Sequence, residues 1–208
     1  MATDNDKIKH RYNRISKVYD MMEKPMELMT MNKWQGELIK RIEGSKILEV
    51  GVGTGKNLRY YPDNVSVVGI DFSTEMLKKA KIKAGENPKI TLLEMDAQQM
   101  TFQDNTFDTV VTSCVFCSVP DPIKGLQEIR RVCKPEGKIV MLEHMRSNHR
   151  VVGKLMDTIN FIPLHFWGAN INRKTLENLK AAGFKAENIE YEDVWTDIVK
   201  LIEIRNKK

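Results

Sequence analysis

Two apolar runs rich in β-branched residues constrain the fold most strongly, because of how each run ends. Residues 47–50 lead into a loop with the pattern G-x-G-x-G, and residues 67–70 end at Asp71, about 20 positions after Gly51. Glycines let the backbone approach a ligand closely, and a carboxylate at the end of the next strand can accept hydrogen bonds from ribose hydroxyls. This layout predicts a β-α-β nucleotide-binding unit.

The spacing of the glycines favours a nucleoside without phosphates over a dinucleotide. In the dinucleotide-binding fingerprint the third glycine comes one place later, where a pyrophosphate sits at the helix N-terminus. Here Gly55 is followed by Lys56 and Asn57. The loop therefore suits S-adenosylmethionine better than a nicotinamide dinucleotide.

Length and composition are those expected of one globular domain. The chain has 208 residues, is 41% hydrophobic and carries a formal net charge of +5. It has no apolar stretch of membrane-spanning length, and its polar N-terminus does not read as a secretory signal. The three cysteines do not form a disulfide framework, so we expect a cytoplasmic protein. Peripheral contact with the inner face of the membrane is a second expectation.

Predicted strands and helices alternate along the chain. Strands are predicted at residues 46–50, 66–70, 90–94, 109–113 and 138–142, and helices at 56–61, 73–84, 122–133 and 173–182. This alternation is typical of an α/β fold with a doubly wound, mostly parallel sheet, which binds its ligand at the carboxyl ends of the strands.

Four motifs occur in the order found in Rossmann-like (class I) S-adenosylmethionine-dependent methyltransferases. Residues 49–55 (EVGVGTG) resemble their motif I, and residues 71–77 (DFSTEML) resemble the segment after the second strand. Residues 96–108 resemble their D-A-x-x-L-P-F-x-D-x-x-F-D segment, and residues 131–137 resemble their R-V-L-K-P-G-G turn. The resemblance implies a seven-stranded sheet with an antiparallel last strand. It also implies a single domain over 1–208, with a helical lid at 1–40 and an acceptor-side insertion at 145–170.

The resemblance and the loop spacing together predict a set of cofactor-binding residues. Asp71 is expected to accept from the ribose hydroxyls, Asp96 from the adenine amino group, and Ser113 is expected to lie near the methionine moiety. The full predicted set is Tyr19, Glu49, Gly51, Gly53, Thr54, Gly55, Asp71, Phe72, Met76, Asp96, Ala97 and Ser113.

Methyl transfer from a sulfonium is an in-line displacement, so a base is needed only when the nucleophile arrives protonated. The candidate catalytic residues are Glu143, His144, His165 and Tyr19, with Tyr12 and Asp20 as further candidates. A histidine beside a carboxylate just past the fifth strand is the strongest of these. The C-x-x-C pair Cys114 and Cys117 has no second pair, so no metal is expected and the cysteines are interpreted as part of the site wall.

Three subfamilies are compatible with the acceptor side. Residues 19–34 resemble the start of the quinone C-methyltransferases, with departures at Glu23, Glu27 and Met31. The Tyr-Asp pair at 19–20 and the basic amphipathic segment 7–22 resemble bacterial phospholipid N-methyltransferases. Residues 117–119, 142–144 and 168–173 resemble membrane-associated thiol S-methyltransferases.

All three subfamilies imply a small lipophilic or amphiphilic acceptor, with a phospholipid amine headgroup as the preferred interpretation and membrane contact through the N-terminal helix. Nucleic acid is not expected as a partner, because residues 113–116 (SCVF) stand where a catalytic N/D-P-P-Y/F-type motif would follow the fourth strand. From other classes, a non-catalytic cofactor-binding module and a nicotinamide oxidoreductase stay open, as does the oligomeric state.

Overall fold

The computed structural model describes residues 8–14, 16, 31–166 and 168–208, and its centre is one seven-stranded sheet. The strands are β1 (Lys46–Val50), β2 (Ser66–Asp71), β3 (Ile90–Glu94), β4 (Phe107–Ser113), β5 (Cys133–His144), β6 (Ile189–Trp195) and β7 (Val199–Arg205). Their order is β3-β2-β1-β4-β5-β7-β6, and β7 runs antiparallel to both of its neighbours. The predicted fold class, a doubly wound α/β sheet with an antiparallel last strand, is confirmed.

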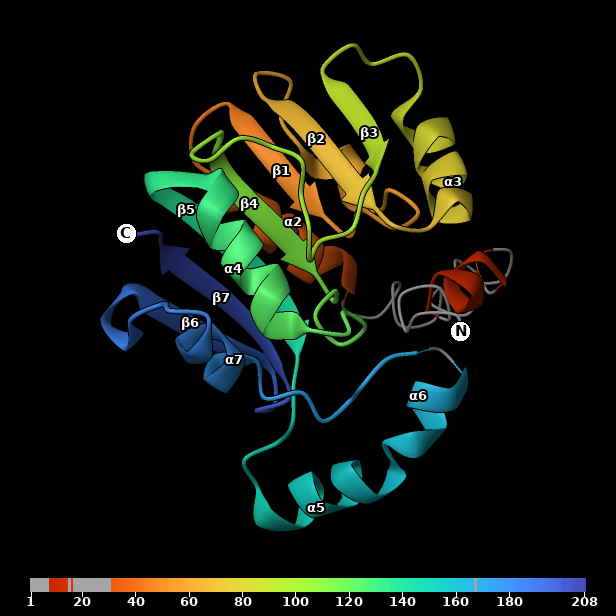
Figure 1. The fold of residues 1–208 in the computed structure, drawn as a ribbon, viewed down its shortest axis with the longest axis vertical. Helices are drawn as coiled ribbons and strands as arrows, with labels where there is room; N and C mark the ends of the chain where they lie inside the picture. Colours follow the sequence, from red (N-terminus) through yellow and green to blue (C-terminus); the bar gives the residue numbers. More distant parts are fainter. Residues whose placement is uncertain (1–7, 15, 17–30, 167) are drawn as a thin grey trace.

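Helices cover both faces of this sheet. They are α2 (Asn32–Lys40), α3 (Thr74–Ala84), α4 (Pro122–Val132), α5 (Arg150–Ile159), α6 (Phe161–Phe166) and α7 (Thr175–Ala181), with short 3-10 turns η2 (Asn57–Tyr60) and η3 (Ala186–Asn188). Residues 8–14 are also helical. In Figure 1, α4 and α7 lie in front of the sheet and α2 lies behind it.

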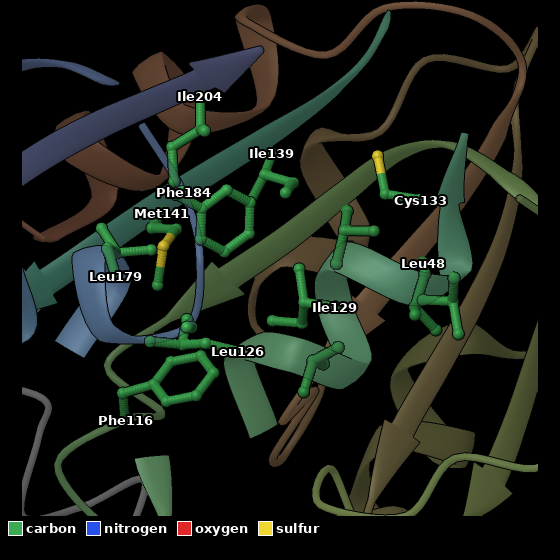
Figure 2. Close-up of a cluster of buried hydrophobic side chains, with 14 of the residues drawn as sticks. Leu48, Phe116, Leu126, Ile129, Cys133, Ile139, Met141, Leu179, Phe184 and Ile204 are labelled. Atoms are coloured by element: carbon green, nitrogen blue, oxygen red, sulfur yellow. The ribbon is translucent and has the colours of Figure 1, made fainter. Parts of the chain in front are cut away.

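Alternation along the strands divides the core into two layers. In β1, Leu48 and Val50 belong to the cluster under α4 and α7, whereas Ile47 belongs to the cluster under α2 and α3. Figure 2 shows the first cluster, where Phe116 and Leu126 meet side chains from the strands. Because successive strand residues point to opposite faces, a strand covered on both sides reads as a continuous apolar run.

Helix starts follow the sequence closely. Ser73 caps α3, where its Oγ accepts from the backbone N–H of Met76 at 3.3 Å, and Asp121 caps α4, where its Oδ1 accepts from Lys124 at 3.0 Å. The helix predicted at 56–61 is wrong in type, because the chain there makes only the 3-10 turn η2 before Pro62. Strand β5 is longer than predicted, since it begins beside Phe107 at Cys133.

Helices α5 and α6 fill the region where the predicted alternation breaks. Figure 1 shows them together at the end of the molecule away from β3, connected to the rest between β5 and α7. An ion pair between Arg146 Nη2 and Asp157 Oδ2, 2.8 Å apart, fixes α5 to the end of β5. Among the described residues, no helix combines the length and apolar character needed to cross a bilayer.

Candidate functional site

A pocket of about 730 Å³, counting the solvent at its mouth, opens where β1, β2 and β4 end. Its lining contains most of the residues predicted to bind the cofactor: Gly51, Gly53, Asp71, Phe72, Met76, Asp96, Ala97 and Ser113. The parallel strand order brings these residues together, because the carboxyl ends of β1, β2 and β4 share one edge of the sheet.

Asp71 connects the glycine-rich loop to the end of β2. Its Oδ2 accepts from the backbone N–H of Gly53 at 2.9 Å, and its Oδ1 accepts from that of Ser73 at 2.8 Å. Burial raises the pKa of Asp71 to about 6, against the lowering effect of these hydrogen bonds. The carboxylate is therefore ionised at neutral pH and oriented toward the pocket before any ligand binds.

The three loop glycines all have positive φ, but for different steric reasons. A Cβ at Gly51 would lie 2.5 Å from a methyl group of Val115, and one at Gly55 would lie 3.0 Å from Ala80 Cα. At Gly53, by contrast, the nearest atom would be the carbonyl oxygen of Gly51, 4.0 Å away. Gly53 therefore leaves open, on the pocket side, a space that a side chain would occupy. That space fits a ligand approaching the backbone, as S-adenosylmethionine would.

Asp96 is held by a residue that sequence reasoning missed. Its Oδ1 accepts from both the backbone N–H and the side-chain Nε2 of Gln98, at 2.9 and 3.0 Å. Gln98 Oε1 in turn accepts from the backbone N–H of Asp121 at the start of α4. An aspartate bonded to the N–H two residues on makes an Asx turn, which Asp96 favours by its residue type, but nothing in the sequence marks Gln98 as its partner.

Three predicted cofactor residues lie behind the lining instead of in it. Glu49 Oε1 accepts from Asn57 Nδ2 at 2.8 Å, and burial raises the pKa of Glu49 to about 7. Thr54 Oγ1 accepts from Lys83 at 3.1 Å, and Gly55 faces Ala80. These residues pack behind the glycine-rich loop and hold its conformation. Tyr19, predicted for both cofactor binding and catalysis, lies outside the described residues.

The loop after β4 forms the opposite wall of the pocket. Glu143 holds this loop through hydrogen bonds on the side away from the cavity lining. The fully buried Glu143 carboxylate accepts from Thr112 Oγ1 at 2.9 Å and from the backbone N–H groups of Val115 and Phe116 at 3.1 and 3.3 Å. Burial raises its pKa to about 7. Cys114, which lines the pocket, has a φ of 55° in this loop. Glu143 therefore orients the wall, and its carboxylate does not reach the pocket.

The two histidine candidates are also outside the lining. His144 is largely buried, and the loss of solvent lowers its pKa. His165 is exposed on α6, with its ring edge-on to Phe166 at 5.3 Å between centroids. The structure therefore brings neither histidine into the pocket, and their catalytic roles stay predictions.

Among the candidate bases in the described part of the chain, Tyr12 lines the pocket, and Asp20, like Tyr19, lies outside that part. Its hydroxyl hydrogen-bonds to that of Ser118, and its ring lies edge-on to Phe72 at 5.7 Å between centroids. Next to it, Asn13 Oδ1 accepts from Ser73 Oγ at 2.7 Å. The helical segment 8–14 thus covers the side of the pocket between α3 and the loop after β4.

Of the C-x-x-C pair, Cys114 lines the pocket as expected, whereas Cys117 is buried behind the lining. Cys117 Sγ donates to the carbonyl oxygen of Cys114 at 3.3 Å, and burial raises the pKa of Cys117 to about 12. A protonated, buried thiol is a weak metal ligand and a weak nucleophile. In the part of the chain that the structure describes, no three His, Cys, Asp or Glu side chains gather as a metal site.

Comparison with known proteins agrees with this geometry. A family model described as a methyltransferase domain matches residues 48–141. Phosphatidylethanolamine N-methyltransferase from Cereibacter sphaeroides is 45% identical over 104 residues, covering 49% of this chain and 51% of the relative. The ubiquinone/menaquinone biosynthesis C-methyltransferase UbiE from Citrifermentans bemidjiense is 33% identical over 153 residues, covering 69% of this chain and 65% of the relative. The chain thus spans less than two thirds of each relative's length.

A solved structure shows the same fold over almost the whole chain. It is an S-adenosylmethionine-dependent methyltransferase from Thermotoga maritima, described as a possible histamine N-methyltransferase, with a TM-score of 0.71 and 18% identity, covering 96% of this chain and 100% of that one. At that identity the likeness concerns the fold alone. The family match includes the glycine-rich loop, Asp71 and the strands that carry them. Residues 48–141 therefore match a methyltransferase domain, and the sheet that contains them has the class I, Rossmann-like fold of the S-adenosylmethionine-dependent methyltransferases.

Proposed function

We propose that this protein transfers a methyl group from S-adenosylmethionine to a small lipophilic or amphiphilic acceptor, and that the acceptor is the amine of a phospholipid headgroup. The observation that carries the proposal is the pairing of Asp71 with the Gly53 backbone at the base of the pocket. It offers a fixed carboxylate for ribose hydroxyls beside an open backbone surface. When bound, S-adenosylmethionine supplies a methyl group on a sulfonium, which is electrophilic without further activation.

The residues of this chain would bind and orient the two reactants and exclude water. Gly53 and Asp71 would hold the nucleoside, and Asp96 would accept from the adenine amino group. Tyr12 and Phe72 would cover the pocket and limit access of water. Reactions of this kind gain most of their rate from such positioning.

The choice of acceptor rests on two kinds of support. The relative from Cereibacter sphaeroides bears the name of a phosphatidylethanolamine N-methyltransferase, and its 45% identity is the higher of the two sequence relatives described above. The pocket also has an apolar side, formed by Met95, Val119 and Pro120. An acceptor attached to a lipid suits such apolar walls, since Asp71 and Asp96 are assigned to the nucleoside.

Membrane contact through the N-terminal helix is part of the same proposal. A protein whose acceptor is a membrane lipid must approach the bilayer surface. The basic residues of the segment 7–22 would favour anionic lipid. Half of that segment, residues 7, 15 and 17–22, lies outside the described residues.

An acceptor screen tests the proposal. The full chain is incubated with S-adenosylmethionine and, separately, phosphatidylethanolamine vesicles, an alkyl thiol and a reduced quinone, and S-adenosylhomocysteine release is measured. We expect release with phosphatidylethanolamine, together with a mass increase on the lipid headgroup. Release with the thiol or the quinone alone would replace the phospholipid assignment, and no release with any acceptor would favour a cofactor-binding module.

The second candidate acceptor is a quinone. It is favoured by the UbiE relative, which matches a larger share of this chain than the phospholipid enzyme does. Methylation at ring carbon would distinguish it, because that product keeps both oxygen atoms unmethylated.

A further inference from the structure

Helices α5 and α6 present an apolar surface that no other described part of the chain covers. On α5 the exposed apolar side chains are Val151, Val152, Leu155 and Ile159, and on α6 they include Phe161 and Phe166. These six residues are called the α5–α6 face below. Phe161 is 67% exposed and Phe166 56% exposed, and no residue of α6 is buried. Exposed large apolar side chains gathered on two successive helices are a feature of interaction sites.

The orientation of α5 is fixed, so this exposure is not a matter of free rotation. Its buried side is Gly153 and Met156, and a Cβ on Gly153 would lie 2.6 Å from the carbonyl oxygen of Ser147. The Arg146–Asp157 ion pair holds the same side. Val151, Leu155 and Ile159, spaced four residues apart, form one line on a different side of the helix. Helix α5 therefore packs one side against the rest of the protein and exposes a second, apolar side to solvent.

The charges next to this line are positive. Arg150 and Lys154 are exposed on α5, and neither forms an ion pair with another described residue. Asp157, the acidic residue of α5, is neutralised by Arg146. A helix with an aromatic and aliphatic side bordered by basic residues has the composition of one that lies in the interface of an anionic bilayer.

The α5–α6 face is also adjacent to the cover of the pocket. Arg11 Nη1 donates to the carbonyl oxygen of Leu164 in α6 at 2.9 Å, and the next residue, Tyr12, lines the pocket. Figure 1 shows α6 near the helical segment 8–14. Lys9 in that segment pairs with Glu94 within the protein. Two basic residues that the sequence assigned to membrane contact are therefore engaged internally.

We propose that the α5–α6 face docks on an anionic lipid bilayer, with Phe161, Phe166 and Leu155 entering the acyl boundary and with Arg150 and Lys154 at the phosphates. The proposal rests on the proposed function only in that docking would bring a lipid headgroup to the pocket. A second copy of the chain is the less suitable occupant. In a two-fold symmetric contact the same patch meets itself, which would place the unpaired cations of both copies at one interface.

Vesicle flotation with the full chain tests the docking surface. Vesicles of phosphatidylcholine alone are compared with vesicles that also contain phosphatidylglycerol. We expect recruitment by the anionic vesicles and loss of recruitment as salt rises, because charges are screened over about 10 Å at 0.1 M salt. The double variant Phe161→Ser/Phe166→Ser should bind at least about tenfold more weakly.

The matched control is Ile82→Ser/Trp195→Ser, which removes two exposed apolar side chains from α3 and β6. It should bind the vesicles like the unmodified chain. Arg150→Gln/Lys154→Gln should lower binding to the anionic vesicles only. Equal losses in the Phe161/Phe166 variant and the control would overturn the proposal.

Two further measurements separate the alternatives. Hydrogen exchange on the unmodified chain should slow at residues 150–166 when anionic vesicles are added, and slowing confined to other segments would contradict the assignment. Light scattering without lipid that shows a dimer, converted to monomer by Phe161→Ser/Phe166→Ser with vesicle binding intact, would assign the face to a second copy.

The docking and the proposed function fail in different ways. If the chain does not bind vesicles but methylates phosphatidylethanolamine in detergent micelles, the docking surface is wrong and the acceptor assignment stands. If it binds vesicles through the α5–α6 face but methylates no phospholipid, the acceptor assignment is wrong.

Discussion

The hydroxyl of Tyr12 hydrogen-bonds to that of Ser118, although the two residues are 106 positions apart. Tyr12 belongs to the N-terminal helical segment, and Ser118 belongs to the loop between β4 and α4. Both line the pocket. The bond therefore joins the cover of the pocket to its far wall.

Loss of this bond should speed release of the cofactor. Because a neutral hydrogen bond contributes about 1 kcal/mol, Tyr12→Phe should raise the dissociation rate of S-adenosylmethionine roughly fivefold. Stopped-flow measurement of Tyr12→Phe, Ser118→Ala and the double variant checks this. The double variant should release the cofactor no faster than either single variant, since each already lacks the bond. Additive effects on the rate would show that the two hydroxyls act independently.

A side chain at Gly53 should block the cofactor without unfolding the protein. Gly53 and Gly85 have φ values of 55° and 59°, and a Cβ at either would meet no protein atom closer than 4.0 Å. Alanine at either position should cost stability through backbone strain, and more at Gly85, whose ψ of −141° lies outside the left-handed helical region, so affinities are compared on folded protein. Only Gly53→Ala should lose affinity for S-adenosylmethionine in calorimetry. If Gly85→Ala loses as much affinity, the loop does not contact the ligand.

Removal of the Asp71 carboxylate should weaken cofactor binding by about 1.5–3 kcal/mol, the range for a hydrogen bond to a charged acceptor. Asp71→Asn keeps an oxygen for the Gly53 or the Ser73 N–H group, so it tests the loss of the charge. Asp71→Ala also removes the acceptor of both N–H groups. Asp63→Ala, an exposed carboxylate before β2, is the control. Calorimetry on folded variants decides, and unchanged affinity in Asp71→Ala would remove the residue from the site.

Affinity should also depend on pH through this residue. The pKa of Asp71 is raised to about 6 by burial, so acidification below that value protonates the acceptor. Binding of S-adenosylmethionine should weaken as pH falls through about 6, and the Asp71→Asn variant should not show this dependence. Calorimetry over a pH series on both proteins measures the difference.

Glu143 should give the ligand-free protein a reversed pH dependence of stability. Its pKa is raised from the ordinary value of 4.5 to about 7, so the folded chain binds more protons than the unfolded chain between these values. Its contribution to stability is therefore fully present below 4.5 and lost as pH rises through about 7. His144, whose pKa is lowered, acts in the opposite direction, so the comparison must isolate Glu143.

Urea unfolding of the unmodified chain and Glu143→Gln over that range provides the comparison. The free energy of unfolding of the unmodified chain should fall relative to that of Glu143→Gln as pH rises. Glu86→Gln, at an exposed position, should give a constant difference. If the difference in the free energy of unfolding between Glu143→Gln and the unmodified chain is also independent of pH, the raised pKa of Glu143 is contradicted.

The part of the molecule that is predicted to bind the methyl donor could be recognised in the sequence because its motifs lie within one β-α-β unit. The cap at Ser73 depends on a residue three positions away, and the carboxylate of Asp71 bonds to Gly53, 18 positions earlier in the same β-α-β unit. An antiparallel last strand was expected only from the family resemblance. The seven residues of β7 do not indicate by themselves which strand they pair with or in which direction. Its pairing with β5 joins residues that are far apart in the chain, such as Leu142 and Leu201.

The parts that sequence reasoning missed depend on contacts between distant segments. Glu143 and His144 were expected just past the fifth strand, as a catalytic pair, but both lie within β5, and the Glu143 carboxylate accepts from the backbone of Val115 and Phe116 behind the pocket wall. Gln98 has no motif of its own and acquires its role from Asp96 and Asp121. Burial and direction of a side chain are decided by the partner segment, which the local pattern does not contain.

The position of α5 and α6 along the chain has an evolutionary consequence. They are inserted between β5 and α7, whereas the glycine-rich loop, Asp71, Asp96 and Ser118 all precede β5. An exchange of residues 146–172 between relatives would leave the register of every strand in place. Replacement of this one continuous segment would therefore change the outer surface of the molecule while leaving the residues that line the pocket in place.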